Sequence, residues 1–514
     1  MKQRSRTEYS LINIFAGLAG YGVNTAVGFV CRIIFVRTLS ADYLGVSGLF
    51  SNILSMLSLA ELGISSAITY ALYKPIADSD GKKVTAIMQF YQKAYAAIGC
   101  VVAMIGLAML PFLSVIITDP PQIKESIYLL YLLYLINTVV SYFLSYRQAL
   151  FTAAQRQYIV TGYNYVITIV QSIVQIGFLL LTHEYITYLL IQIIGSITYN
   201  IWIFYKAGKD YPYINDKEVE PLSNEDTKSL LKNIKALAVN KISGVLVNST
   251  DDIAITFFNG ISSVGYASNY TLFSSTLNKL VTLLFNGLTG SVGNLNASSD
   301  NETRYRFFNA LNLANFWLYG WAAIGMAFVS GDLVKLFYGA DYVLPLKIPL
   351  ILAINFYTIG MLHASYTYKS TLGLFRYGQY ILIFTGVINI VLDVILGKWM
   401  GVFGIYLATF GARLCTNLWY EPYAVYKYGL KKNPLLYFAR HLKFTAILVS
   451  TGFICCWLCS FCNFSTALTI LLKVIICTVI PNGAFFLIFR KTEEGTYLIR
   501  SAKRILCRIL SFVH

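Results

Sequence analysis

Eight ionisable side chains interrupt long apolar stretches of this chain, and they are the residues best placed to do chemistry. Four are cations and four are anions: Arg32, Lys241, Lys279 and Arg413, with Glu61, Asp251, Asp252 and Asp393. A charge at mid-bilayer costs at least about 2.5 to 3.5 kcal/mol on insertion scales, so each charge needs a partner or a function. Buried cations bind phosphate strongly, and a buried carboxylate can exchange a proton or a metal cation. Structural pairing or snorkelling is an equally weighted reading for any single residue.

The helical faces around these charges are polar. At about 100° per residue, Arg32 shares its face with Tyr21, Thr25 and Gly28. The faces of Lys279 and Arg413 also carry hydroxyl and amide groups, in particular Ser268, Ser275, Thr282 and Asn286 for the first and Tyr406, Thr409, Asn417 and Tyr420 for the second. Such faces are typical of a hydrated cavity, and lipid-facing surfaces are apolar.

The elements that carry these residues are predicted to be membrane-spanning helices. The 514 residues are 57% hydrophobic and 12% charged, with mean hydropathy +0.61, whereas soluble domains carry roughly a quarter charged residues. Because about 20 apolar residues cross the hydrocarbon core, the pattern predicts an all-α integral membrane protein of about 14 transmembrane helices. They lie near 10–36, 43–73, 86–117, 124–152, 158–182, 186–207, 233–258, 264–295, 305–330, 344–370, 376–397, 401–427, 442–461 and 464–489.

Basic residues are distributed unevenly between the two sides of these spans. Most of the 40 Lys and Arg fall on the side of the N-terminus, which predicts that both termini are cytoplasmic. The same asymmetry explains the net charge of +16, so nucleic acid is not an expected partner. The basic, amphipathic tail at 491–514 is predicted to lie on the anionic inner leaflet, which makes membrane lipids a partner.

A hydrophilic stretch at 208–232 divides the chain into two halves. We predict a six-helix bundle at 1–207, a cytoplasmic linker at 208–232, a second six-helix bundle at 233–430, an extra helix pair at 431–490 and the tail at 491–514. A weak repeat at an offset of 220 residues places Gly45 on Gly265 and Arg32 on Asp252. The repeat suggests a gate, an Arg32–Asp252 contact that opens when substrate competes for the arginine.

The remaining reactive groups favour packing over catalysis. Cys455, Cys456, Cys459 and Cys462 have metal-like spacing, but they lie in an unbroken apolar run where small soft side chains pack well, so no metal site is expected. The sequence shows no phosphate-binding loop and no nucleophile with its base. We therefore expect a protein that is not an enzyme and holds no cofactor, with a polysaccharide polymerase as the less favoured alternative.

Several motifs resemble one family. The residues from Ser40 to Val46 (SADYLGV) and from Gly48 to Ile64 (GLFSNILSMLSLAELGI) resemble the second-helix region of polysaccharide-unit flippases. These proteins form the polysaccharide-transport branch of the multidrug/oligosaccharidyl-lipid/polysaccharide exporter superfamily. Further matching stretches follow in the same order, namely ALYKP at 71–75, TDD at 250–252, GYASNY at 265–270, SVGN at 291–294 and WYEPY at 419–423.

The resemblance implies two bundles in a V-shaped arrangement with a central cavity, working by alternating access in the bacterial plasma membrane. It implies translocation of undecaprenyl-pyrophosphate-linked oligosaccharide units for capsule or O-antigen assembly, with other polysaccharide-assembly proteins as partners. Under this reading the substrate-binding residues are Arg32, Lys241, Lys279 and Arg413.

The energy source is left open by the resemblance. Coupling to a proton or sodium gradient would use Glu61, Asp251 or Asp252, and His363 is a weaker candidate that is more simply explained as a packing residue. Two alternatives also stay open, a flippase of the peptidoglycan-precursor lipid and a cation-coupled multidrug exporter.

Overall fold

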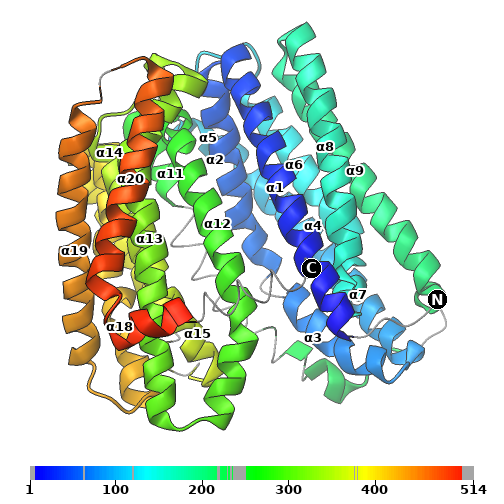
Figure 1. Cartoon of the computed structure of the whole chain (residues 1–514). Helices are drawn as coiled ribbons and strands as arrows, with labels where there is room; N and C mark the ends of the chain where they lie inside the picture. Colours follow the sequence, from blue (N-terminus) through cyan, green and yellow to red (C-terminus); the bar gives the residue numbers. More distant parts are fainter. Residues whose placement is uncertain are drawn as a thin grey trace, which may run out of the picture. The chain divides into compact units, whose positions relative to one another are not determined.

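The computed structural model of the chain is all-helical in the part that it describes (Figure 1). It describes residues 6–500 except 62–63, 118–120, 155, 217–219, 229, 232–233, 235–249, 375–376, 379 and 463, with only the backbone at 6–19, 59–60, 66, 70, 74, 77, 283–284, 286–291, 293–294 and 296–298. Helices are expected because hydrocarbon offers no partner for backbone N–H and C=O groups, which a helix satisfies internally. Nine helices in this described part are long and apolar enough to cross a membrane. The prediction of an all-α membrane protein is thus confirmed.

The helices fall into two compact units, Met1–Gly265 and Tyr266–His514. The first unit contains α1 (Arg6–Thr38), α2 (Ala41–Leu57), α3 (Ile64–Ala77), α4 (Gly81–Ala108), α5 (Leu113–Ile116), α6 (Ile127–Ser145), α7 (Gln148–Ala153), α8 (Gln157–Thr182), α9 (Tyr185–Asp210) and α11 (Asp251–Asn259). Within it α8 packs against both α1 and α9. The long helix α12 (Ile261–Ser298) begins in this unit and continues into the second.

The second unit contains the remaining helices. They are α13 (Asn301–Tyr338), α14 (Lys347–Met361), α15 (His363–Thr371), α16 (Ile381–Met400), α17 (Val402–Cys415), α18 (Asn417–Ala424), a π-helical turn (Val425–Gly429), α19 (Leu435–Ser460) and α20 (Thr466–Phe489). At about 1.5 Å per residue, the 38-residue α13 is longer than the hydrocarbon core is thick. It is the scaffold of the unit, since α14, α19 and α20 all pack on it.

Most predicted spans coincide with described helices, but five of them are broken. The span at 86–117 divides into α4, a 3-10 turn (Leu110–Phe112) and α5, and the span at 124–152 divides into α6 and α7. The span predicted at 43–73 divides into α2, the 3-10 turn Ser58–Glu61 and α3. The span at 344–370 divides into α14 and α15, and the span at 401–427 into α17 and α18. The seventh span is described only at its end, as α11, because residues 235–249 lie outside the described part.

The predicted domain boundaries stay predictions. The two compact units divide at Gly265, beyond the predicted linker, because the described end of the seventh span packs on α2. The described part of the linker is ordered against α4, where Lys83 pairs with Asp226 at 3.1 Å and Thr85 donates to the carbonyl of Tyr213. The hydrogen bond from Lys83 lowers the pKa of Asp226 below its usual value. Most of the tail at 491–514 lies outside the described residues.

The start of α12 crosses α2 in a reciprocal contact that matches the offset of 220. A Cβ at Gly45 would lie 2.2 Å from the carbonyl oxygen of Ile261, and a Cβ at Gly265 would lie 2.3 Å from that of Ala41. Ala41 and Gly45 are offset by 220 residues from Ile261 and Gly265, so the two approaches are the same contact made twice. Between them, Ser262 donates to Asp42, and these two residues are 220 positions apart. Glycine at both positions permits a backbone-to-backbone crossing that a side chain would prevent.

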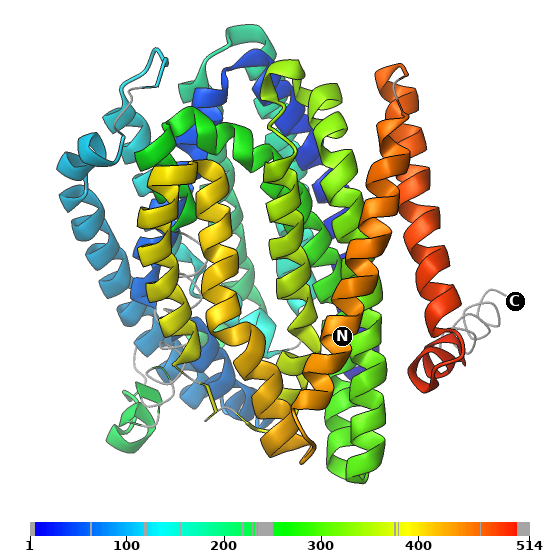
Figure 2. The ribbon, with the colours of Figure 1, turned by 90° about the vertical axis from the view of Figure 1, so that its left-hand side faces the viewer.

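The last two long helices form an antiparallel pair on α13 (Figure 2). Lys473 of α20 pairs with Asp332 at 2.6 Å, and Trp317 donates to Asn482 at 2.7 Å. Polar contacts therefore fix α20 on α13 at two levels, and these side chains avoid an uncompensated position in hydrocarbon.

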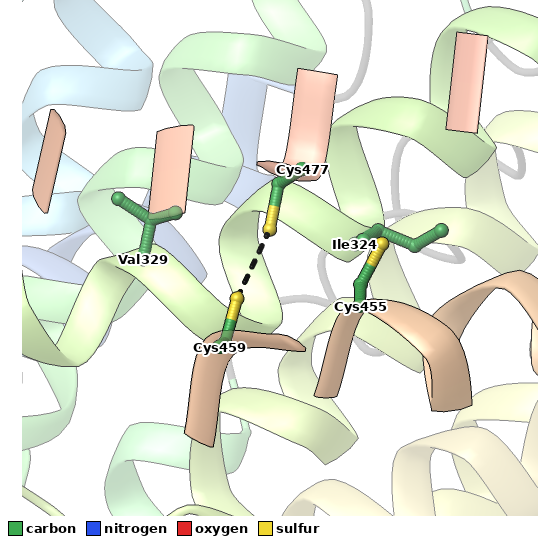
Figure 3. Close-up of a cluster of buried hydrophobic side chains, with 5 residues drawn as sticks. All are labelled: Ile324, Val329, Cys455, Cys459 and Cys477. Atoms are coloured by element: carbon green, nitrogen blue, oxygen red, sulfur yellow. Dashed lines mark hydrogen bonds between the residues drawn. The ribbon is translucent and has the colours of Figure 1, made fainter. Parts of the chain in front are cut away.

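An apolar layer that includes three buried thiols lies between α13, α19 and α20 (Figure 3). Cys459 and Cys477 approach to 4.0 Å between sulfur atoms, and Cys455 lies beside Ile324. Of the four cysteines with metal-like spacing, Cys456 is exposed while the other three are buried. The four thiols consequently do not converge on one point, which supports the packing interpretation.

Candidate translocation site

A polar pocket lies within the first unit, between α3, α4, α7 and the end of α6. Its volume is 520 Å³, and its lining consists of Ser65, Thr69, Tyr73, Tyr91, Tyr95, Ser145, Gln148, Ala149 and Thr152. Three tyrosine rings and five hydroxyl or amide side chains therefore face one space, and none of the lining residues whose side chains the structure describes is charged. Aromatic rings together with neutral hydrogen-bonding groups are the chemistry that recognises a polyhydroxylated ligand such as a sugar.

The predicted coupling residue Glu61 lies next to this pocket. The Tyr95 hydroxyl, on the pocket wall, donates to Glu61 Oε1 at 2.7 Å. Tyr95 is held in turn by Tyr91, whose ring centroid is 4.3 Å away in an edge-to-face arrangement. The 3-10 turn that ends at Glu61 interrupts the second predicted span, so the carboxylate is presented by irregular backbone between α2 and α3. A ligand in the pocket would compete for the Tyr95 hydroxyl and thereby alter the environment of Glu61.

The other two predicted coupling residues begin α11. Asp251 and Asp252 occupy the first turn of this helix, where the helix dipole stabilises negative charge. Asn52 of α2 donates to Asp252 Oδ2 at 2.5 Å, so an amide holds this carboxylate.

Arg32 lies on α1, within the first predicted span. The preceding residue, Cys31, lies with its sulfur 3.7 Å from the hydroxyl of Tyr188 on α9. Asp252, the carboxylate expected to meet Arg32, accepts a hydrogen bond from Asn52. The Arg32–Asp252 gate stays a prediction.

Arg413 is buried among α14, α16 and α17. Arg413 is only 5% exposed, and its Nη1 donates to Asn355 Oδ1 at 3.3 Å. Asn389 of α16 bonds Asp393 and the hydroxyl of Thr409, at 3.1 and 3.4 Å. The polar face predicted around Arg413 exists, but it is packed against helices. Binding of substrate by Arg413 would require the Asn355 contact to open.

Lys279 is exposed on α12, near a second aromatic cluster. The neighbouring Asn278 accepts a 2.8 Å hydrogen bond from Tyr319. His363 stacks on Tyr319 with ring centroids 5.6 Å apart and an interplanar angle of 14°. This stacking supports the packing interpretation of His363. The fourth predicted cation, Lys241, lies outside the described residues.

Sequence reasoning missed a buried ion pair in the second unit. Lys369 Nζ lies 2.9 and 2.8 Å from the two oxygens of Glu421, which is 1% exposed. Of the two residues, only Glu421 stood out in the sequence, because it is a single carboxylate within the aromatic run WYEPY. Lys369 lies at the end of the span predicted at 344–370, where a lysine is expected to face water. A π-helical turn follows directly at Val425–Gly429, and such turns recur at functional sites.

No group of three or more His, Cys, Asp or Glu residues that could hold a metal ion occurs in the part of the chain that the structure describes.

Comparison with solved structures identifies the fold. A structure described as the lipid II flippase MurJ in an inward closed conformation matches with TM-score 0.63 and 15% identity, over 94% of this chain and 99% of that chain. An inward-facing multidrug resistance MATE family transporter of the MOP superfamily matches with TM-score 0.54 and 14% identity, over 76% and 93%. A Vibrio cholerae MATE transporter matches with TM-score 0.54 and 12% identity, over 83% and 99%.

These likenesses define the class of the protein at the level of fold. The chain is a multi-pass membrane protein with the fold that the MurJ flippase and the MATE transporters share. No protein-family model and no curated protein sequence matches it. At 12 to 15% identity the likeness does not extend to substrate or coupling, which must be argued from this chain's own residues.

Proposed function

We propose that this protein is a flippase that moves undecaprenyl-pyrophosphate-linked oligosaccharide units from the inner to the outer leaflet of a bacterial plasma membrane. The observation that carries the proposal is the extent of the fold likeness. The lipid flippase matches 94% of this chain, against 76% and 83% for the two transporters. A chain built on the plan of a lipid flippase along nearly its whole length is more simply a carrier of lipid-linked cargo than of free drugs.

The tyrosine-lined pocket supports a carbohydrate headgroup. Its volume of 520 Å³ and its neutral lining of rings, hydroxyls and one amide suit sugar rings, which present apolar faces and hydroxyl edges. A cationic or strongly apolar drug would be better served by a charged or wholly apolar lining. The pocket thus favours the oligosaccharide reading over the multidrug alternative.

The charged residues divide by role in this proposal. Arg32, Lys241 and Lys279 contact the pyrophosphate, and Arg413 joins them only after its Asn355 contact opens. Glu61, which touches the pocket wall through Tyr95, is the favoured coupling residue, with Asp251 and Asp252 as gating residues. Membrane lipids and other polysaccharide-assembly proteins are the expected partners, and both termini are cytoplasmic.

A flippase of the peptidoglycan precursor is the second candidate, and the MurJ likeness specifically favours it. Both candidates carry a sugar-bearing headgroup on a lipid, so the pocket does not separate them. Substrate competition separates them directly.

The test is transport by the full-length protein reconstituted in vesicles. Labelled lipid-linked oligosaccharide should cross the bilayer faster than in empty vesicles, with and without an imposed ion gradient. Excess unlabelled lipid II should compete weakly, and a cationic dye should not compete. Strong competition by lipid II would favour the second candidate, whereas failure to move any lipid-linked sugar would contradict both.

A matched pair of variants tests the pocket. Tyr73→Ala removes a half-exposed ring from the pocket, whereas Tyr205→Ala removes an exposed ring of α9 outside it. Loss of a stacking ring is worth about 0.5–1.5 kcal/mol, so Tyr73→Ala should slow transport about two- to tenfold and Tyr205→Ala should not. Equal effects of the two variants would remove the pocket from the mechanism.

A further inference from the structure

A second cavity lies in the second unit, where α19 begins and α20 ends. It has a volume of 360 Å³, room for about a dozen water molecules at about 30 Å³ each. Its lining comes from α13, α19, the last residue of α20 and the residues just after it, and it includes Arg440, Lys443, Phe444, Phe489, Thr492 and Glu494. None of these residues takes part in the translocation site described above.

The charges around this cavity leave it one cation in excess. Arg440 Nη2 pairs with Glu494 Oε1 at 3.2 Å, while Nη1 of the same guanidinium is buried without a hydrogen-bond partner among the described residues. Lys443 is exposed, with Nζ 6.0 Å from the centroid of the Phe489 ring. A buried donor without an acceptor is costly, so this arrangement favours a ligand that brings acceptor oxygens. Guanidinium and ammonium groups together match a phosphate.

The surroundings of the cavity indicate that the ligand also has an apolar part. On α19, Leu435 and Leu442 are 70% and 71% exposed, and Leu436 is 48% exposed. In a chain that crosses a bilayer, such side chains face hydrocarbon. Phe444 and Phe489, which are buried, supply apolar side chains to the cavity wall itself. The phosphate site therefore opens next to a surface suited to acyl chains.

We propose that this cavity binds the phosphodiester headgroup of an anionic bilayer phospholipid, whose acyl chains lie along the exposed apolar face of α19. A free phosphate would gain the two cations but none of the apolar contact. A zwitterionic lipid would bring its own ammonium group toward Arg440 and Lys443, which repel it. An anionic phospholipid gains both the contact with the two cations and the apolar contact, without that repulsion. It would hold α19 and α20 in place at the membrane surface.

The experiment measures lipid retention on the full-length protein in detergent by native mass spectrometry. Phosphatidylglycerol should be retained about fivefold more than phosphatidylcholine. Arg440→Gln and Lys443→Gln should each lower the retention of phosphatidylglycerol about fivefold, since a basic residue near an anionic lipid contributes about that much. Lys398→Gln, which removes an exposed cation at the end of α16, is the matched control and should have no effect.

Glu494→Gln should change the retention of phosphatidylglycerol in the opposite direction, which distinguishes loss of the site from unfolding of the variant. Removing this carboxylate frees Arg440 for the headgroup, so retention should rise, whereas a purely structural Arg440–Glu494 pair would make it fall. The proposal is overturned by equal retention of the two phospholipids, or by Arg440→Gln and Lys398→Gln behaving alike. Displacement of phosphatidylglycerol by inorganic phosphate or by undecaprenyl phosphate at equal concentration would also overturn it, by showing that the site serves a different phosphate.

Discussion

At the scale of single residues, the structure distinguishes by burial and by partner several charged residues that look alike in the sequence. Glu61, Asp252, Lys279 and Arg413 all interrupt apolar stretches, and composition gives them equal standing. The structure leaves Lys279 exposed, buries Arg413 against Asn355, and connects Glu61 to a pocket through Tyr95. Burial and partners therefore rank these residues, and Glu61 becomes the first to test.

Glu61→Gln should abolish the response of transport to an imposed proton gradient, because the amide cannot exchange a proton. Passive transport should persist, since the glutamine can still accept the hydrogen bond from Tyr95. The measurement is transport of labelled lipid-linked oligosaccharide in vesicles with and without the gradient. Tyr95→Phe, which keeps the ring and removes the hydroxyl, should weaken the response without abolishing it. A Glu61→Gln protein that responds like wild type would exclude this carboxylate from proton coupling.

Asp252→Asn should slow transport by about tenfold or more, since a hydrogen bond to a charged group is worth about 1.5–3 kcal/mol. The reason is that the variant weakens the Asn52 contact and removes the charge that a moving Arg32 could meet. Combining Arg32→Asp with Asp252→Arg should partly restore transport if the two groups meet during the cycle. Glu184→Gln, in an exposed turn of the same unit, is the control. Normal transport by both Arg32→Asp and Asp252→Asn as single variants would contradict the Arg32–Asp252 gate.

At the scale of elements, hydropathy predicted most of the helices but not the breaks within them or the polar contacts between them. The spans are long apolar runs, so their positions follow from composition alone. The break at Ser58–Glu61 was missed because the residues on both sides of it are equally apolar. The Lys369–Glu421 pair was missed because its partners are 52 positions apart and come from α15 and α18. The pocket was missed because serine, threonine and tyrosine on four separate helices give no signal until the helices are packed.

Breaking the buried Lys369–Glu421 pair should destabilise the second unit strongly. Glu421→Gln leaves a largely buried ammonium without its counter-charge, a change that typically costs about 3–5 kcal/mol. The thermal unfolding midpoint of the protein in detergent should fall accordingly. Lys432→Gln, which breaks the exposed pair with Glu302, should change the midpoint little. Exchange of the two residues, Lys369→Glu with Glu421→Lys, should recover part of the loss, and no recovery would indicate that the site depends on more than charge.

The described end of the linker should detach from α4 in acid. The hydrogen bond from Lys83 lowers the pKa of Asp226, so this contact stabilises the docked linker above the usual carboxylate pKa and is lost as pH falls through the lowered value. Hydrogen exchange at 223–228, corrected for its intrinsic pH dependence, should rise in that range. In Lys83→Gln the exchange should already be faster at neutral pH and should change less on acidification. An identical pH profile in the two proteins would show that another contact holds the segment.

At the scale of the whole molecule, the internal repeat has a physical counterpart in the crossing of α2 and α12. The offset of 220, which rested on few sequence identities, also relates the two glycine approaches and the Asp42–Ser262 contact. The repeat is therefore supported at the residues where the two helices touch.

Gly45→Ala should impair transport, because its methyl group would meet the carbonyl oxygen of Ile261 and force the helices apart. Overpacking of this kind typically costs about 1–3 kcal/mol. Gly265→Ala should have the same effect, since it faces Ala41 in the equivalent way. Gly162→Ala on α8, which would meet nothing within 4 Å, is the control for both. The measurement is the transport rate at matched protein content, and different outcomes for the two glycines would show that only one approach matters.

The reciprocal crossing of α2 and α12 gives the chain one property of a homodimer joined into a single polypeptide. In a true homodimer every substitution at a symmetric interface occurs twice, so both copies of a contact change together. Here the two copies are encoded separately, and each can change alone. Asp42 and Ser262 already show the result, since equivalent positions carry an acceptor and a donor that no pair of identical subunits could supply.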